Sequence, residues 1–199
     1  MKYKQVHLGR NVSIGKNVIL GEGSKDLGEL IIGDNAKIRS GTVIYLGTII
    51  GDNFQTGHNA LIREHNQIGH SAVLGSFSEL APHNQIGNYT TVHGHCFLES
   101  VTLGDYVFVA PGVVFLDDLF PIDPDQKNYK GAFIGDDTAI GGHSTICPHL
   151  TIGSRVLIGA GSVVTKDVPD DEIWKGNPAC FFRKTGYLPG TRKRYEKNN

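Results

Sequence analysis

The chain has 199 residues, and its 19 Lys and Arg residues nearly cancel its 20 Asp and Glu residues, leaving a net charge of −1. This length predicts one domain, and the balanced charge provides no basic field of the kind that binds nucleic acid. The chain is 39% hydrophobic but has no apolar run of about 18 residues, so we expect a globular protein without a membrane-spanning helix. Glycine occupies 26 positions, which disfavours a mostly helical fold because helices tolerate glycine poorly.

The N-terminal segment, MKYKQVHLGR, lacks the apolar core of a secretory signal. The three cysteines are odd in number and scattered at Cys96, Cys147 and Cys180, which argues against a disulfide framework. We therefore expect a cytoplasmic protein.

An aliphatic residue recurs at every sixth position from residue 8 to residue 98, with exceptions only at Asp26 and Thr56. The pattern slips by one residue between Leu98 and Leu103, and it runs again without a miss over 134–164. Glycine often follows the aliphatic residue, and a small residue often precedes it by two positions. A period of six fits neither a helix nor a simple strand, but it fits short extended segments joined by corners at which glycine or asparagine permits a positive φ. Three such sides predict a triangular coil of 18 residues.

A repeated string supports the figure of 18 residues. HNQIG occurs at 65–69 and again at 83–87. This spacing predicts that the two histidines stack on adjacent coils and that the two asparagines, in the inward small position, pair as a ladder. The sequence therefore predicts a parallel β-helix of about eight stacked coils.

Two segments depart from the repeat. Residues 22–30 predict a short side loop, and 116–133 predict a long ejected loop with four acidic residues and two prolines. A long loop on a rigid scaffold is commonly functional. We expect the β-helix domain to cover 1–166 and a short C-terminal tail with a basic end to cover 167–199.

Three features together resemble the hexapeptide-repeat acyltransferases. They are the [LIV]-G-x4 repeat, the loop that follows VAPGVVF (109–115), and the final signature IGAGSVVTKDVP (158–169) with GNPA (176–179). The resemblance implies a left-handed β-helix, a homotrimer, and three acyl-CoA sites in the grooves between subunits. The hand comes from the resemblance alone, since the period does not reveal it.

Three segments are similar to a subgroup of that family, the N-acetyltransferases of nucleotide-linked amino sugars. They are HNALIREHNQIG (58–69), HGHCFLE (93–99) and FLDDLFP (115–121). The subgroup implies acetyl-CoA as co-substrate and a role in surface-polysaccharide (lipopolysaccharide) biosynthesis. Hydroxyl-directed relatives in the family place a catalytic histidine before the loop proline, where this chain has Phe120. An amine needs less base assistance than a hydroxyl, so this departure favours N-acetylation.

The resemblance and the residue types give candidates for three roles, each with a plain structural alternative such as a solvated corner, a loop acid or a surface ion pair. A carboxylate or an imidazole can orient the amine or accept its proton, polar corner residues and Arg63 can hold the sugar and its phosphate, and small residues with nearby cations can hold coenzyme A. The catalytic candidates are Asp117, Glu99, His95 and His93; the substrate-binding candidates are His58, Asn59, Arg63, His65 and Asp118; the cofactor-binding candidates are Gly142, Ala160, Thr165, Lys166 and Arg183.

The expected mechanism is direct attack of the amine on the thioester, without an acyl-enzyme, because no cysteine has a base partner apparent in the sequence. Two other functions remain open. One is a zinc enzyme of the gamma-type carbonic anhydrase kind, suggested by the spacing of His65 and His70. The other is a non-catalytic β-helix subunit of a larger assembly.

Overall fold

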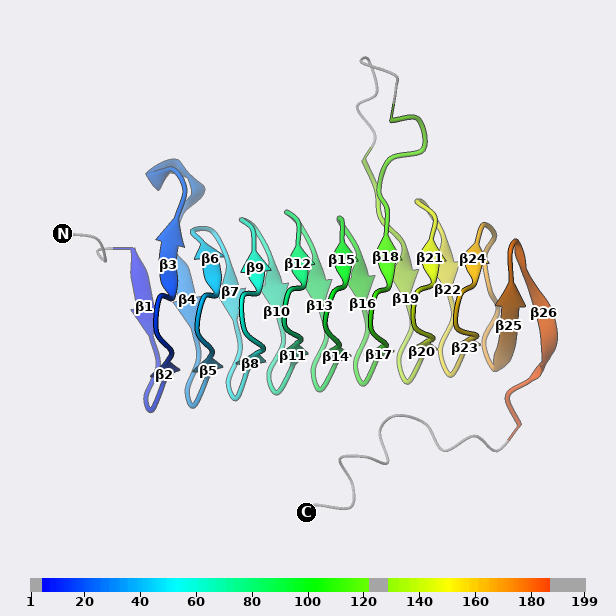
Figure 1. Cartoon of the computed structure of the whole chain (residues 1–199), viewed down its shortest axis with the longest axis horizontal. Coiled ribbons are helices and arrows are strands. Elements are labelled where there is room, and N and C mark those ends of the chain that lie inside the picture. Colours follow the sequence, from blue (N-terminus) through cyan, green and yellow to red (C-terminus); the bar gives the residue numbers. More distant parts are fainter. Residues whose placement is uncertain (1–4, 122–128, 187–199) are drawn as a thin grey trace.

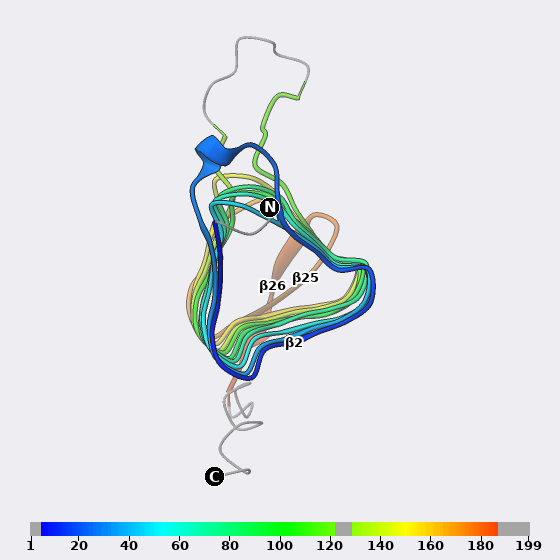
Figure 2. The same cartoon turned by 90° about the vertical axis from the view of Figure 1, so that its left-hand side faces the viewer.

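The computed structural model describes residues 5–121 and 129–186, which wind into a prism with three faces (Figure 1). Each face is a sheet of short strands, and successive strands of the chain pass from sheet A to sheet B to sheet C and back to A. All pairings between coils are parallel. Viewed from its N-terminal end the prism is triangular, and its coils are left-handed (Figure 2).

Sheet A is built from the first strand of each coil: β1 (Val6–Leu8), β4 (Leu30–Ile32), β7 (Ile49–Ile50), β10 (Gln67–Ile68), β13 (Gln85–Ile86), β16 (Thr102–Leu103), β19 (Phe133–Ile134) and β22 (Thr151–Ile152). Sheet B contains β2 (Ser13–Ile14), β5 (Lys37–Ile38), β8 (Gln55–Thr56), β11 (Val73–Leu74), β14 (Thr91–Val92), β17 (Phe108–Val109), β20 (Ala139–Ile140), β23 (Leu157–Ile158), β25 (Glu172–Gly176) and β26 (Ala179–Lys184). Sheet C contains β3 (Ile19–Glu22), β6 (Val43–Tyr45), β9 (Leu61–Ile62), β12 (Glu79–Leu80), β15 (Phe97–Leu98), β18 (Val114–Phe115), β21 (Thr145–Ile146) and β24 (Val163–Val164).

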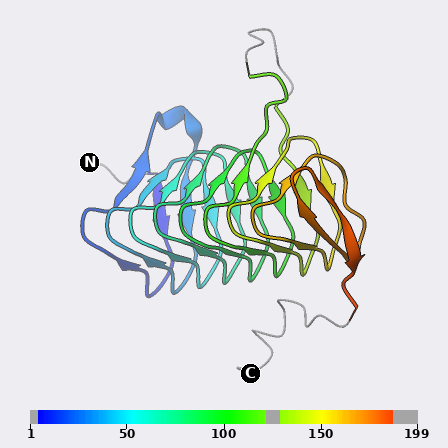
Figure 3. The ribbon, with the colours of Figure 1, turned by 45° about the vertical axis from the view of Figure 1, so that its right-hand side comes forward.

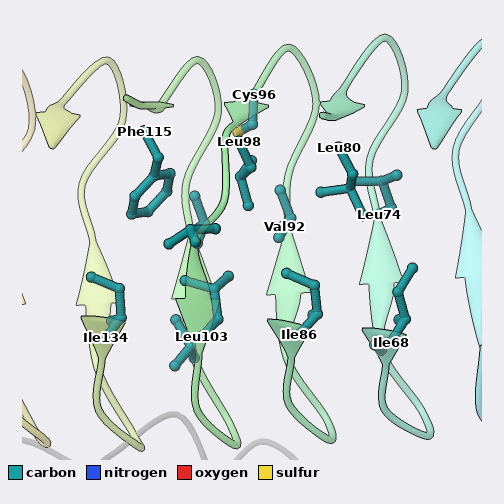
Figure 4. Packing of buried hydrophobic residues seen from close by; sticks show 14 of the residues in the cluster. Ile68, Leu74, Leu80, Ile86, Val92, Cys96, Leu98, Leu103, Phe115 and Ile134 are labelled. Atoms are coloured by element: carbon teal, nitrogen blue, oxygen red, sulfur yellow. The ribbon is translucent and has the colours of Figure 1, made fainter. Parts of the chain in front are cut away.

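The core is a stack of inward side chains, most of them aliphatic, that the three faces of successive coils contribute (Figure 4). Ile68, Ile86 and Leu103 illustrate one row, and all three are buried. Burying such side chains is the main favourable term of folding. A single coil cannot enclose its own interior, so each coil depends on its neighbours for burial.

The small inward residues do more than fill space. Ser78 Oγ accepts a hydrogen bond from the backbone N–H of Cys96 at 3.1 Å, and Thr90 Oγ1 accepts one from the backbone N–H of Val107 at 3.1 Å. Each of these donors belongs to the next coil along the axis. A hydroxyl at this position therefore supplies an acceptor that the strand ladder does not provide.

The corners place side chains outward along the three edges of the prism. The third corner residue has a left-handed backbone, as at Asn59 (φ 53°), but histidine also occupies this position at His65 (φ 59°) and His95 (φ 61°). Glycine and asparagine are therefore joined by other residue types at these corners. We call the two edges that border sheet C the B–C edge and the C–A edge, after the sheets that they join.

Two segments leave the prism at the same edge (Figures 1 and 2). One contains the short 3-10 helix η1 (Lys25–Leu27), between β3 and β4, and the other lies between β18 and β19. Both pass from sheet C to sheet A, so both leave at the C–A edge. The predicted side loop and ejected loop are thus present, although residues 122–128 lie outside the described residues.

The hairpin of β25 and β26 closes the C-terminal end of the prism (Figure 3). β25 pairs in parallel with β23, so the first part of the tail continues sheet B. Trp174 packs against the core, and its Nε1 donates to Glu172 at 2.7 Å. The left-handed β-helix with an ejected loop and a short tail is confirmed, while the predicted basic end at 187–199 lies outside the described residues. None of the described helices has the length and hydropathy needed to span a membrane.

Candidate functional site

The C–A edge carries a carboxyl pair at the base of the ejected loop. Ser100 Oγ donates to Asp117 Oδ2 at 2.7 Å, and Glu99 and Asp118 lie beside Asp117 as half-buried neighbours. The backbone N–H of Phe120 donates to Asp118 Oδ1 at 2.8 Å. The structure therefore brings the predicted residues Glu99, Asp117 and Asp118 together in one place.

This site coincides with a shortened corner of the repeat. Ile86 pairs with Leu103, 17 residues away rather than 18, because only three residues separate β15 from β16. Glu99 and Ser100 are two of the three residues of this shortened corner, whereas the equivalent corner of the preceding coil has four residues. The phase slip in the sequence therefore marks the site.

The loop returns against the same corner. The N–H of Lys130 donates to the carbonyl oxygen of Asp117 at 3.1 Å, which closes the base of the loop. The backbone of Gly131 passes so close to the carbonyl oxygens of Glu99 and Ser100 that a Cβ at this position would collide with both. Glycine is required here for this close approach and not for an unusual φ. The loop base is thus fixed by both backbone and side-chain contacts.

Burial raises the pKa of the Glu99 carboxyl above its ordinary value, and the negative charges of Asp117 and then Asp118 raise it further. A carboxylate with a raised pKa is a stronger base than an ordinary surface glutamate. The pair can therefore receive a proton from a ligand positioned at the loop base.

Two further candidates lie on the same edge in the preceding coils. The rings of His65 and His83 stack, as predicted, with centroids 5.1 Å apart. Arg63 makes a two-pronged ion pair with Glu64, with both N–O distances at 2.9 Å, and its guanidinium lies 5.1 Å from the centre of the Tyr45 ring. This fixed pose leaves the remaining Nη of Arg63 for a ligand.

The other imidazole candidates occupy the B–C edge. The ring of His58 lies 2.7 Å from Ser40 Oγ, and its backbone N–H donates to Ser76 Oγ at 2.9 Å. His95 stacks on Phe77 with centroids 5.2 Å apart, while His93 meets the Phe108 ring edge-on at 5.0 Å. Asn59 is exposed beside His58.

A groove follows this edge. It is lined by Arg39, Gln55, Thr56, Gly57, Val73, Leu74, Gly75, Ser76, Phe77, His93, Gly94 and His95. His93 and His95 thus face this groove, with sheet C between them and the carboxyl pair. In one chain they do not join Glu99 and Asp117.

The cofactor-binding candidates are divided in the same way. Gly142 and Ala160 lie on successive coils of the B–C edge, where the corners are lined by small residues. Thr165 and Lys166 are exposed at the C–A edge, beyond β24. Arg183 lies on β26, where its Nη1 donates to the carbonyl oxygen of Lys184 at 3.3 Å. A single chain therefore does not gather these five residues around one ligand.

The zinc alternative has no support within one chain, because His65 and His70 lie on different edges. His70 follows β10 at the corner from sheet A to sheet B, whereas His65 precedes β10 at the C–A edge. Among the described residues, no group of three potential metal ligands lies close enough to hold an ion.

Sequence reasoning missed two residues of the C–A edge. Ser100 has a direct bond to Asp117, and the phase slip at that corner was the signal for it. His83 was predicted to stack but was not considered for a ligand, although the repeated HNQIG string places it beside His65.

Two segments of the chain match known repeat families. Residues 131–166 match the bacterial transferase hexapeptide (six repeats), and residues 9–46 match the hexapeptide repeat of succinyl-transferase. These matches lie at opposite ends of the prism. They agree with the repeat that its three sheets display.

Two curated relatives and one solved structure are similar to the chain over part of its length. One relative is a Saccharomyces cerevisiae protein named as an acetyltransferase by assignment only. It is 34% identical over 117 residues, which cover 55% of this chain and 60% of the relative. The galactoside O-acetyltransferase of Escherichia coli is 36% identical over 90 residues, covering 43% of this chain and 44% of its own. The chain thus spans less than two thirds of both relatives.

The solved structure is a hexapeptide-repeat acetyltransferase from Vibrio cholerae in complex with acetyl coenzyme A. It superimposes with a TM-score of 0.53 at 29% identity, covering 58% of this chain and 69% of that one. Over these parts of its length the chain is therefore similar to hexapeptide-repeat acetyltransferases.

Proposed function

We propose that the chain is an acetyl-CoA-dependent N-acetyltransferase that acts on the amino group of a nucleotide-linked sugar, in surface-polysaccharide biosynthesis. The observation that carries the proposal is the pair of Glu99 and Asp117 at the base of the ejected loop, with Phe120 in place of a loop histidine. The acetyl-CoA complex of the Vibrio cholerae relative supports the choice of co-substrate.

In the proposed reaction the free amine attacks the thioester carbonyl carbon, the new C–N bond forms, and the C–S bond breaks to release coenzyme A. The attacking nitrogen carries one proton too many after the attack. Glu99, a carboxylate made more basic by burial, accepts that proton, and Asp117 holds the amine. Since the nucleophile is the substrate's own nitrogen, no acyl-enzyme forms.

A homotrimer with shared sites explains why the candidates are divided between two edges. Both edges border sheet C. The outward row of that sheet is mostly apolar, with Glu79 and Thr145 as its polar members; its apolar members are Ile19, Val43, Leu61, Phe97, Val114 and Val163. A second copy covering sheet C would bury this row. We propose that the B–C edge of one copy, with Gly142 and Ala160, then faces the C–A edge of the next, with Glu99, Asp117, Thr165 and Lys166.

The test is thiol release from acetyl-CoA with a panel of nucleotide-linked amino sugars. We expect turnover with at least one amino sugar and a loss of about 10²-fold in Glu99→Gln, the lower end of the range for acid–base catalysis, because an amine needs less base assistance. Glu29→Gln, a carboxylate paired with His7 at the N-terminal end, is the matched control and should keep full activity. No turnover across the panel, or equal losses in both variants, would refute the proposal.

O-acetylation is a second candidate, favoured by the identity with the galactoside O-acetyltransferase. An acceptor that offers both an amine and hydroxyl groups separates the two reactions, because NMR of the product distinguishes an amide from an ester. An ester product, or turnover with sugars that lack an amine, would establish the second candidate in place of the first.

A further inference from the structure

The N-terminal part of sheet B carries a groove whose three basic residues have no predicted role, although His58, a predicted substrate-binding residue, also lines it. Its lining includes Lys16, Lys37 and Arg39 together with Ser40 and His58. The remaining residues of its lining are Ser13, Gly15, Asn17 and Ile38. The lining thus contains three cations and no carboxylate, in a chain whose net charge is −1.

These cations have no counter-ions within the described part of the chain. Three arginines elsewhere on the prism, by contrast, have acidic partners: Arg10 with Asp34, Arg63 with Glu64, and Arg155 with Asp171. No ion pair involves Lys16, Lys37 or Arg39 in residues 5–121 and 129–186, and all three side chains are exposed. Like charges gathered without partners repel one another, so a bound anion would relieve that cost.

The backbone leaves room for a ligand beside Arg39. Arg39 is the first residue of its corner, and the equivalent residues of the coils on either side are Gly15 and Gly57. The neighbouring glycines have no side chain to cover the guanidinium. Lys37 points outward on β5, between Ser13 on β2 and Gln55 on β8.

Polar groups beside the cations complete the lining. Ser40 Oγ and His58 Nδ1 lie 2.7 Å apart, which fixes both at the rim of the groove. Lysine, arginine and hydroxyl donors are the side chains that bind phosphate oxygens, and arginine can do so through two parallel bonds.

We infer that this groove binds the phosphate groups of a phosphate-bearing ligand, through Lys16, Lys37 and Arg39. Arg39 also lines the neighbouring groove that contains His93 and His95. Phosphates held at the basic end would therefore direct the rest of the ligand along the B–C edge toward these histidines. If the proposed function holds, the phosphates belong either to the nucleotide of the acceptor or to coenzyme A.

Calorimetric titration distinguishes the two sources without any need for turnover. The probes are UDP, for the acceptor's diphosphate, and adenosine 3′,5′-bisphosphate, for the phosphates of coenzyme A. The variant is Lys16→Gln combined with Arg39→Gln, and Lys25→Gln on η1 is the control with a cation lost outside the groove. All three side chains are exposed, so the thermal unfolding of the variants should match that of the wild type.

We expect at least one probe to bind the wild type, and its dissociation constant to rise about tenfold or more in the double variant but not in the control. Arg39→Lys should restore part of the loss, and added salt should weaken wild-type binding. Weakened UDP binding assigns the groove to the acceptor, and weakened bisphosphate binding assigns it to the coenzyme. Binding of neither probe below about 1 mM, or equal affinity in the wild type and the double variant, would overturn the inference. A chain that binds a probe here but transfers no acetyl group would refute the proposed function alone.

Discussion

Replacing Asn84 by leucine tests how the coils are joined beneath the C–A edge. Asn84 is fully buried; its Nδ2 donates to the carbonyl oxygens of Ala81 at 2.6 Å and Leu98 at 3.2 Å, and its Oδ1 accepts the N–H of Val101 at 2.9 Å. Leucine has a similar size but removes all three bonds. The loss of stability depends on which of the three backbone groups keep another hydrogen-bond partner.

The two carbonyl oxygens keep a partner in the variant. The carbonyl oxygen of Ala81 still accepts a hydrogen bond from Asn66 Nδ2 at 3.0 Å. The carbonyl oxygen of Leu98 still accepts one from the backbone N–H of Ala81 at 2.9 Å. The N–H of Val101, at a residue with no exposed surface, loses its acceptor. An orphaned buried donor costs about 1–3 kcal/mol, and two weakened carbonyl sites add about 1 kcal/mol, so we expect a loss of about 2–4 kcal/mol.

Urea unfolding followed by circular dichroism, at one protein concentration because association would shift the midpoint, measures this loss. Gln85→Leu makes the same chemical change on the adjacent, exposed side chain, and its effect should stay within about 0.5 kcal/mol. Equal stability of Asn84→Leu and Gln85→Leu would show that Asn84 does not supply an obligatory acceptor to Val101.

Three further outcomes are expected. Burial and the charge of Asp117 raise the pKa of Glu99, so the stability that Glu99 contributes is complete below the ordinary pKa of glutamate and is lost as the pH rises through the raised value. Glu99→Gln should therefore be more stable than the wild type at pH 7. Thermal unfolding from pH 4 to 8 measures this difference, and a less stable Glu99→Gln at pH 7 would contradict it. Gly131→Ala should lower activity while leaving the circular dichroism spectrum unchanged, because its Cβ would push the loop base off the carbonyl of Glu99; wild-type activity would disprove the contact. Burial raises the pKa of the Cys96 and Cys147 thiols, so iodoacetamide at pH 7 should label the exposed Cys180 first. Mass spectrometry measures the order of labelling, and early modification of Cys96 in the folded protein would contradict its burial.

The period of six was sufficient to predict the fold, because each inward aliphatic residue fixes the phase of its own strand. It also predicted that His65 lies over His83, since an 18-residue shift returns the chain to the same edge. The loops at 22–30 and 116–133 were visible as breaks in the same pattern.

The contacts within the site could not be predicted in this way. The bond from Ser100 to Asp117 depends on a corner one residue shorter than its neighbours and on a loop that returns through Gly131. Periodicity gives the face and the coil of a residue, but not the path of a loop outside the repeat. The division of Glu99 and His93 between two edges was hidden for another reason. Motif resemblance predicts which residues act together in an assembly, not which of them meet in one chain.

Both excursions of the backbone depart at the edge where sheet C turns into sheet A, which leaves the opposite corners free of insertions in the described coils. A change in the length or sequence of either excursion alters what is presented at that rim without disturbing the register of any rung beneath it. Changes in these two segments can thus alter what the C–A edge presents to a ligand, while the corners of the B–C edge keep their regular spacing.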